Sequence, residues 1–282
     1  MSGKKKRRQL KLLIIPVLML GIAILCYPFI SGYLNQKNQS RVVENYQETI
    51  GDMTDTDADS VTEEAEKFNR KLWEENGTVF GGYSSELSGL YSSELDEDGI
   101  MGYLSIPCID ITIPIRHGTA EDTLANACGH MEGSSLPVGG KNTHAVLTGH
   151  RGLPTSKLFT DLDQLKTGDK FYLHVFGRTL AYMVDQISTV LPGDVTQLGI
   201  FPDIDCVTLV TCTPYGINSH RLLIRGVRTT YEPEEENNTK SVRAFSGEAR
   251  VTWLLIIGAV FAIFLMVLLI PAYYRRKLRK KG

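Results

Sequence analysis

The sequence predicts an all-β domain, a barrel or a sandwich, over residues 100–231, and three observations support this. Apolar residues alternate strictly at residues 109–115, where Ile occupies every second position. Further short strand-like runs follow, and only short helical pieces such as residues 156–165 interrupt them. A parallel sheet would need a helix between each pair of strands, which this segment lacks. The other strand candidates are residues 102–106, 144–149, 171–175, 179–187, 207–213 and 221–228.

The segment before the β domain combines a stalk, a helix and a long loop. Residues 35–59 are polar and poor in large apolar side chains, which suits a stalk next to a membrane. Ser60 and Glu63 have the spacing of a capping box, and apolar residues follow at helical intervals. Residues 61–73 are therefore predicted to form an amphipathic helix that packs on the main domain. Residues 76–98 are rich in Gly, Ser, Glu and Asp, and a loop of this length is a binding element, a lid or a disordered segment.

Each end of the chain carries an apolar run next to a cluster of basic residues. Residues 12–30 and 251–270 are each long enough, at roughly 1.5 Å per residue, to cross a hydrocarbon core of about 30 Å. The basic clusters at residues 4–8 and 275–281 lie on the outer sides of these runs. The positive-inside rule then places both termini in the cytoplasm. The first run also fits a cleaved signal peptide, but its length and the lack of an A-x-A site favour an uncleaved anchor.

These features divide the chain into seven parts. They are a basic cytoplasmic tail (1–11), a transmembrane signal-anchor (12–30), an extracytoplasmic stalk, helix and lid candidate (31–99), the β domain (100–231), a linker (232–250), a second transmembrane helix (251–271) and a basic cytoplasmic tail (272–282). The predicted location is the cell membrane, with the β domain on its outer side.

Charge and cysteine content argue against several kinds of site. The 282 residues carry a net charge of −2, and the position of the basic clusters beside apolar runs explains them without nucleic-acid binding. Outside the apolar runs, the chain has Cys108, Cys128, Cys206 and Cys212, whose spacings match no compact disulfide framework. Because the sequence has no C-x-x-C or H-x-x-x-H pair and no Gly-rich phosphate loop, we expect neither a metal nor a cofactor.

One stretch near the end of the β domain concentrates the reactive residues. In residues 208–225, TLVTCTPYGINSHRLLIR, an apolar strand ends on Cys212 and a turn with Pro, Gly and Asn follows. The returning strand opens on Arg221, whose fixed cation would favour a thiolate and hold a developing oxyanion. Taken alone, this cysteine also fits a small buried apolar residue, and Arg221 fits an ordinary surface charge.

A second strand-end motif supplies a third residue. Residues 145–150, AVLTGH, repeat the arrangement at the cysteine, because an apolar strand ends on His150 beside a glycine. A lone histidine at a strand end is usually structural, but nucleophilic acyl transfer needs a thiolate, a proton donor and an oxyanion holder. His144 and His220 compete for the role. His144 lies at the far end of its strand, and His220 faces away from Arg221, so His150 is the best candidate.

These residues resemble the sortase family. TLVTC followed by PYGINSHR is similar to the sortase signature TLxTC with its downstream arginine, and LTGHRG is similar to the sortase histidine motif. The resemblance covers about residues 102–228 and includes HGT at His117, SLPVGGKNTHAVLTGHRGLP and LFTDLDQL. Within the family it is closest to the pilus-assembling class C sortases, with which the C-terminal apolar run and the long segment before the β domain agree.

The resemblance implies an eight-stranded sortase-type β-barrel with short helices and a cysteine transpeptidase activity. It makes Cys212 the nucleophile, His150 the general acid and base, and Arg221 the group that holds the oxyanion and orients the substrate. The implied substrate is a surface protein with an LPxTG-type sorting signal, which is cleaved after its Thr through a thioester. A Lys amine of a neighbouring pilin subunit would then accept the acyl group, so that pili are polymerised.

One feature departs from the class C pattern. Class C sortases commonly carry a lid in which an Asp-Pro-aromatic motif inserts over the cysteine, and residues 76–98 contain no such tripeptide. Phe80 and Tyr83 occupy roughly the expected place. The sequence therefore predicts a looser lid, formed by Phe80 or Tyr83, or no lid.

Three other functions remain open on the sequence. A related sortase would anchor proteins to the cell wall, with a peptidoglycan amine as acceptor. A thiol protease or hydrolase would use water as acceptor. A non-catalytic exported binding domain would need an inert Cys212, whereas a sortase needs a thiol that is alkylated rapidly and selectively.

Overall fold

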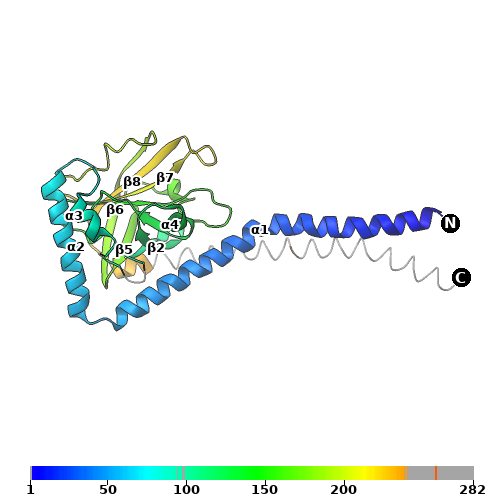
Figure 1. Cartoon of the computed structure of the whole chain (residues 1–282), viewed down its shortest axis with the longest axis horizontal. Helices are drawn as coiled ribbons and strands as arrows, with labels where there is room; N and C mark the ends of the chain where they lie inside the picture. Colours follow the sequence, from blue (N-terminus) through cyan, green and yellow to red (C-terminus); the bar gives the residue numbers. More distant parts are fainter. Residues whose placement is uncertain (1, 94, 97–98, 238, 240–257, 259–282) are drawn as a thin grey trace. The chain divides into compact units, whose positions relative to one another are not determined.

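Eight strands close into one barrel in the order β1-β2-β3-β4-β7-β8-β6-β5. Figure 1 labels β2, β5, β6, β7 and β8 among them. The β2–β3 and β4–β7 pairs are parallel, and the other neighbouring pairs are antiparallel. The strands are β1 (Gly102–Ile106), β2 (Ile111–His117), β3 (Cys128–His130), β4 (Thr143–Thr148), β5 (Lys170–Val175), β6 (Arg178–Val190), β7 (Asp205–Thr213) and β8 (His220–Thr229). The predicted eight-stranded all-β fold is confirmed.

The structure is a computed structural model that describes residues 2–93, 95–96, 99–237, 239 and 258. Residues 1–231, which contain the barrel, form one unit, and residues 232–282 form another. A search of the described residues finds no helix both long and apolar enough to span a membrane. The span predicted at residues 12–30 falls in α1 (Ser2–Asp52). Within residues 12–30, most side chains lie outside the described part. The span predicted at residues 251–271 also lies outside it, apart from Gly258.

Alternation along the strands separates the barrel interior from an outer face. On β7, Val207 and Leu209 belong to the main hydrophobic core. The residues that alternate with them, Thr208, Val210 and Cys212, therefore project from the outer face. The outer face also carries a small apolar group, which we call the outer cluster. It consists of Val146, Val190, Leu198, Val210 and Leu223, with Phe80 and Met131 packed against it.

Local chemistry accounts for the differences from the predicted strands and helices. β3 has only three residues, too few to show an alternation. β2 begins after a 3₁₀ turn, η1 (Pro107–Ile109), because Asp110 takes a left-handed conformation with φ 54° that reverses the chain. The helical piece predicted at residues 156–165 reduces to a 3₁₀ turn, η2 (Leu162–Gln164). The short helix α4 (Glu121–Asn126) precedes β3.

Residues 35–59, predicted to be a polar stalk, are mostly helical and partly docked on the barrel. Val43 and Tyr46, on the second half of α1, are buried against Ile100 and Tyr103. The Tyr46 hydroxyl accepts a hydrogen bond of 2.9 Å from the backbone N–H of Phe176. Val43 and Tyr46, one helical turn apart, thus attach this polar segment to the domain, and Val42 and Ile50 pack beside them.

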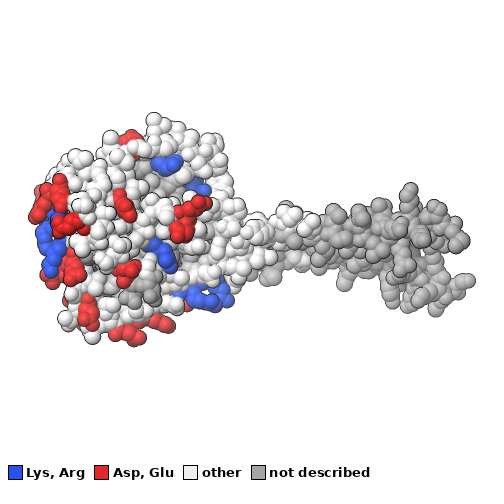
Figure 2. All heavy atoms as spheres, in the orientation of Figure 1, with Lys and Arg blue, Asp and Glu red and all other residues white. Residues whose placement is uncertain are grey.

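The amphipathic helix before the barrel, α2 (Asp55–Asn76), starts earlier than predicted. Its N-cap is Thr54, whose hydroxyl accepts from the Asp57 N–H at 3.2 Å and donates to the Asp57 carboxylate at 2.6 Å. Thr54 and Asp57 therefore cap the N-terminus of the helix, the role that the sequence predicted for Ser60 and Glu63. The helix buries Ala65, Phe68 and Leu72 in the core, while acidic and basic side chains cover the end of the domain where it lies (Figure 2).

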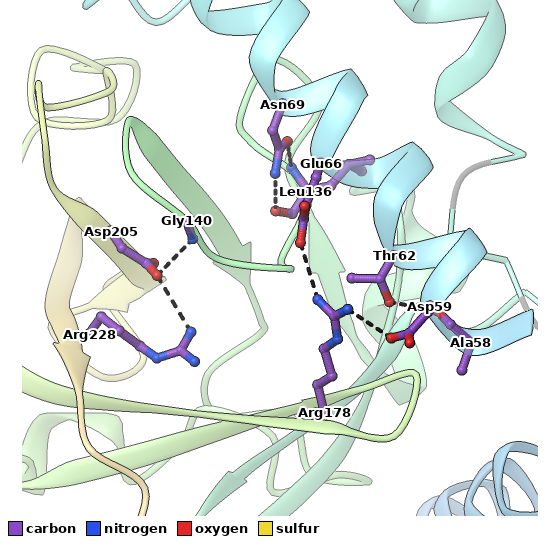
Figure 3. Close-up of polar contacts among 10 residues, drawn as sticks. All are labelled: Ala58, Asp59, Thr62, Glu66, Asn69, Leu136, Gly140, Arg178, Asp205 and Arg228. Carbon is purple, nitrogen blue, oxygen red and sulfur yellow. Dashed lines mark hydrogen bonds and ion pairs between the residues drawn. The ribbon is translucent and has the colours of Figure 1, made fainter. Parts of the chain in front are cut away.

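Polar contacts fix α2 to the barrel at two points (Figure 3). The buried Asn69 side chain donates to the Leu136 carbonyl at 3.0 Å and accepts from the Leu136 N–H at 2.7 Å. Arg178, at the start of β6, donates to Asp59 at 2.9 Å and to Glu66 at 3.1 Å. The chain that leaves α2 towards α3 (Ser85–Tyr91) thus starts from an anchored position.

Candidate active site

Three neighbouring strands align the predicted cysteine and arginine in one transverse row. The register pairs Cys212 of β7 with Arg221 of β8, and Arg221 with Val190 of β6. Paired residues of adjacent strands project from the same face, and we call this set row A. The next rows on this face follow at two-residue steps, each roughly 7 Å further along the strands. Row B contains Thr148, Val210, Leu223 and Ser188, and row C contains Val146, Thr208, Arg225 and Gln186.

His150 reaches row A from β4, which runs parallel to β7. After the pairing of Thr148 with Val210, the Gly149 N–H donates to the Val210 carbonyl at 3.1 Å. The Thr211 hydroxyl in turn donates to the Gly149 carbonyl at 2.7 Å. The backbone therefore continues beside β7 past the strand end, and this register, extended by two residues, leads to His150 opposite Cys212. The structure pairs Cys212 with Arg221, and His150 follows two residues after the end of the neighbouring strand β4.

The glycine in front of His150 is required by packing. A Cβ atom at Gly149 would lie 2.8 Å from the ring of Phe159. The Phe159 N–H also donates to the His150 carbonyl at 3.1 Å. Phe159 thus holds the chain on both sides of the turn, which fixes the backbone that carries the imidazole.

Cys212 differs in its exposure from Cys128 and Cys206, the two other cysteines on barrel strands. All five cysteines of the chain are free, and Cys128 and Cys206 are buried. Burial raises the pKa of the Cys206 thiol to about 12 and raises the pKa of Cys128 as well. Cys212 is half-buried at the strand end, where a reagent or substrate can reach it. Solvent access therefore distinguishes Cys212 from the other two as a candidate nucleophile.

Arg221 is held in place by the turn that precedes it. Its Nη1 donates to the carbonyls of Asn218 at 3.3 Å and His220 at 3.1 Å. Within the described chain, the other guanidinium N–H groups have no protein partner. These donors are free to hydrogen-bond an oxyanion or a substrate carbonyl on the outer face.

The competing histidines are committed to other contacts. His144 is fully buried between the Gly199 carbonyl and the Thr208 hydroxyl, both at 2.7 Å, and burial lowers its pKa to about 4. His130 is also buried, and its pKa is lowered to about 4 for the same reason. His220 contacts the Ser219 hydroxyl at 2.9 Å. No cluster of three metal-ligating side chains occurs in the part of the chain that the structure describes.

Known proteins match the barrel and the segment before it. A family model described as a sortase domain matches residues 104–229. A crystal structure of sortase C1 from Streptococcus agalactiae is 45% identical, with a TM-score of 0.65, over 68% of this chain and 100% of that one. Sortase C of Streptococcus pneumoniae, whose structure is described as informative on pilin substrate specificity, is 44% identical (TM-score 0.61; 68% and 97%). Sortase C of Clostridium perfringens, solved with the C-terminal cell wall sorting motif, is 44% identical (TM-score 0.60; 68% and 100%).

This chain belongs to the sortase family. The three structures named above are class C sortases, in agreement with the resemblance of its motifs. As a sortase, it is a cysteine transpeptidase. Sortases act on LPxTG-type sorting signals of surface proteins.

The sortase site contains a further residue to which the sequence analysis gave no role, Arg151. Its side chain is only 6% exposed. Nε donates to the Thr160 carbonyl and Nη1 to the Thr213 hydroxyl, both at 3.2 Å, and Nη2 is paired with Asp163. Arg151 therefore ties the loop after His150 to the residue after Cys212. The sequence signal that could have identified Arg151 is its position directly after the candidate catalytic histidine, His150.

The two lid candidates of the sortase occupy different environments. Phe80 packs on the outer cluster, which belongs to the same face as Cys212. The Tyr83 ring instead lies between Phe68 and Tyr91, with centroids 5.2 and 5.1 Å away, and its hydroxyl donates to the Ser134 carbonyl at 2.7 Å. Of the two aromatic rings, Phe80 is therefore the one on the outer face.

The backbone around Phe80 fits between two glycines. A Cβ atom at Gly199 would lie 2.0 Å from the Thr78 carbonyl oxygen, and one at Gly133 would lie 2.0 Å from the Gly81 carbonyl oxygen. Only glycine permits so close an approach of the backbone. Residues 78–81 thus lie as a strap across the outer face of the barrel.

Proposed function

We propose that this sortase is membrane-tethered and joins LPxTG-bearing proteins to a Lys amine of a pilin subunit. The single observation that carries the catalytic part is row A, where Cys212 and Arg221 are paired and His150 follows on the adjacent strand. A thiol, a proton carrier and a cation on one face are the groups that acyl transfer through a thioester requires.

In the first half-reaction, the Cys212 thiolate attacks the carbonyl carbon of the Thr in the sorting signal. The free guanidinium donors of Arg221 stabilise the oxyanion of the tetrahedral intermediate. When the C–N bond to the following Gly breaks, His150 donates a proton to the leaving amine. The products are a thioester on Cys212 and a released C-terminal peptide.

In the second half-reaction, a Lys amine replaces the released peptide. The amine attacks the thioester carbonyl, and His150 accepts the proton that the amine loses. The C–S bond breaks, the thiolate of Cys212 is restored, and an isopeptide bond links the two proteins. Catalysis is therefore complete without any group beyond the three side chains and the two substrates.

The location and the acceptor rest on different observations. The apolar runs at residues 12–30 and 251–271, with basic clusters on their outer sides, support two membrane anchors and an outward-facing barrel. The matched structures support a pilin acceptor, since they are class C sortases and one is described in terms of pilin specificity. Peptidoglycan is the alternative acceptor, and it would use the same first half-reaction.

We also propose that residues 78–81 act as a lid, with Phe80 in the position that the sorting signal must occupy. The placement of Phe80 on the outer cluster beside row A supports this. No Asp-Pro pair precedes Phe80. The lid is therefore held by the packing of Phe80 on the outer cluster and by the close approach of its backbone to Gly133 and Gly199. Tyr83, also a lid candidate, would serve as the anchor at one end of the strap.

The test uses the full chain with an LPxTG peptide, a pilin fragment that carries a Lys, and mass spectrometry of the products. We expect an acyl adduct on Cys212 and then a peptide–Lys conjugate. A Cys212→Ala chain should give neither, and a Cys206→Ala chain should give both. An adduct that only a glycine amine or water resolves would overturn the pilin acceptor. The absence of an adduct, together with a Cys212 that alkylating agents do not modify, would refute the catalytic proposal.

A further inference from the structure

A cavity of about 170 Å³ lies on the outer face of the barrel, below row A. Residues of rows B and C form one side of the cavity, and the connection between β6 and β7 forms the other side. Cavities of roughly this volume accept a benzene-sized group in other proteins. The cavity is therefore large enough for one uncharged side chain of a peptide.

The cavity lies at a defined distance from the cysteine. Thr208, which lines it, is four residues before Cys212 on the same strand face. At about 3.3 Å per residue this is roughly 13 Å. The lining residues Leu223 and Ser188 are closer, one row from Cys212, so Thr208 marks the far end of the cavity. A peptide whose Thr carbonyl is at Cys212, and which follows the strand direction, reaches this far end with its fourth residue upstream. In an LPxTG signal this residue directly precedes the Leu.

The outer cluster lies between the cysteine and the far end of the cavity, and its member Leu223 also lines the cavity. Val210 and Leu223 of this cluster are in row B, one step from row A. They offer an apolar surface for the Leu and Pro of the signal. In row C, all the residues that line the cavity are polar, namely Thr208, Arg225 and Gln186. This polar end of the cavity coincides with the residue that directly precedes the Leu.

The polar wall of the cavity presents one free donor and one free acceptor. The Gln197 Oε1 atom accepts from Gln186 Nε2 at 2.9 Å and from the Ser188 hydroxyl at 2.7 Å. Gln197 Nε2 and Gln186 Oε1 have no protein partner in the described part of the chain. The first is a donor and the second an acceptor, so together they complement a carboxamide, which has both functions.

The charge in the cavity wall is already compensated. Arg225 donates to the two carboxylate oxygens of Asp185 at 3.0 and 2.5 Å, and its guanidinium lies 4.8 Å from the centroid of the Phe201 ring. A bidentate pair of this kind leaves little net charge for a ligand. The cavity therefore favours a neutral polar group over a carboxylate or an ammonium.

The walls are also fixed before any ligand binds. His144 Nδ1 must donate to the Gly199 carbonyl, so its Nε2 accepts from the Thr208 hydroxyl. This buried bridge joins the β6–β7 connection to β7. A preformed site spends little free energy on ordering its own side chains.

We propose that this cavity is a specificity subsite for a Gln or Asn side chain at the residue that directly precedes the Leu of the sorting signal. The inference rests on the proposed function, because the position is counted from a Thr bound at Cys212. The carboxamide donates to Gln186 Oε1 and accepts from Gln197 Nε2.

The experiment measures kcat/KM of the full chain for peptides that differ only at this residue, with Gln, Asn, Leu, Glu or Lys. We expect Gln and Asn to exceed Leu and Glu by about five- to thirtyfold, the size of one or two net hydrogen bonds. In a Gln197→Glu chain, the acceptor oxygen for Gln186 and Ser188 remains, but the free donor is replaced by a carboxylate. The preference should then shift to Lys. Gln164→Glu, on the exposed η2 turn, is the matched control and should keep the Gln preference.

The outcomes separate this inference from the proposed function. Equal rates for all five peptides, with an acyl adduct on Cys212, would overturn the subsite and leave the transpeptidase intact. A preference that is the same in the Gln197→Glu chain would place the selection elsewhere. If Gln197→Glu does not fold, Gln186→Met removes the free acceptor instead, and loss of the Gln preference is expected. No adduct with any peptide would overturn the proposed function and the subsite with it.

Discussion

Replacing Arg151 by Ala should weaken both the stability and the catalysis of this sortase. The side chain is 6% exposed, and its two hydrogen bonds reach Thr160 and Thr213. Hydrogen bonds from a charged donor contribute about 1.5 kcal/mol each at the lower end, so their loss costs about 3 kcal/mol. The pair with Asp163 adds little, because that carboxylate is 49% exposed. In a domain of this size the cost lowers Tm by about 6–12 °C.

The expected effect on the rate follows from geometry. Arg151 is adjacent to His150, and its partner Thr213 is adjacent to Cys212, so its loss frees both chain segments that form row A. A displacement of about 1 Å between reacting groups can cost about 100-fold, and we expect kcat/KM to fall by 10- to 100-fold. Arg151→Lys keeps the charge but not the planar fork, so we expect an intermediate loss.

The assay combines thermal unfolding with kcat/KM for an LPxTG peptide, measured well below Tm. Arg178→Ala is the matched control, because it removes an arginine with two acidic partners far from row A. Thr213→Val should lower the rate alone and add little in the Arg151→Ala chain. An Arg151→Ala chain that keeps its rate within twofold, or a Thr213→Val effect that is fully additive, would refute the reasoning.

Three further predictions concern the lid, the thiol and pH. Phe80→Ala removes the apolar contact of the strap, so the rate of peptide cleavage should rise several-fold. Tyr83→Phe, which removes only one hydrogen bond, is the control. An unchanged cleavage rate in the Phe80→Ala chain would contradict the lid. Alkylation followed by mass spectrometry should modify Cys212 before Cys206 and Cys128, because burial raises the pKa of the latter two; equal labelling would contradict this. His130 and His144 have pKa values lowered to about 4 by burial. In the unfolded chain these histidines bind a proton near pH 6.5, whereas in the folded protein they stay neutral until the pH falls to about 4. Their full contribution to the free energy of unfolding is therefore present above pH 6.5 and decreases as the pH drops. Near pH 5 the loss is about 2 kcal/mol per histidine. Urea unfolding of His144→Gln should show a flatter pH dependence than the unaltered chain.

The sequence alone determined the fold class, every strand except β3, and the reactive residue types. Alternating Ile residues, strand-end Cys212 and His150, and strand-start Arg221 are local patterns, and local patterns reflect the period of the backbone. The same holds for Pro214, which cannot donate to a sheet, so that β7 ends just before it at Thr213. The sortase motifs covered the same residues, so the physical and the family arguments agreed.

The tertiary structure decided which residues act on one another. β3 is too short to show a period, yet it connects β2 to β4 and so helps to close the barrel. The contact of Arg151 with Thr213, the separation of Phe80 from Tyr83, and the cavity beside Gln197 all join residues distant in sequence. Such contacts depend on which strands pair and in which register, and neither follows from the period of a single strand.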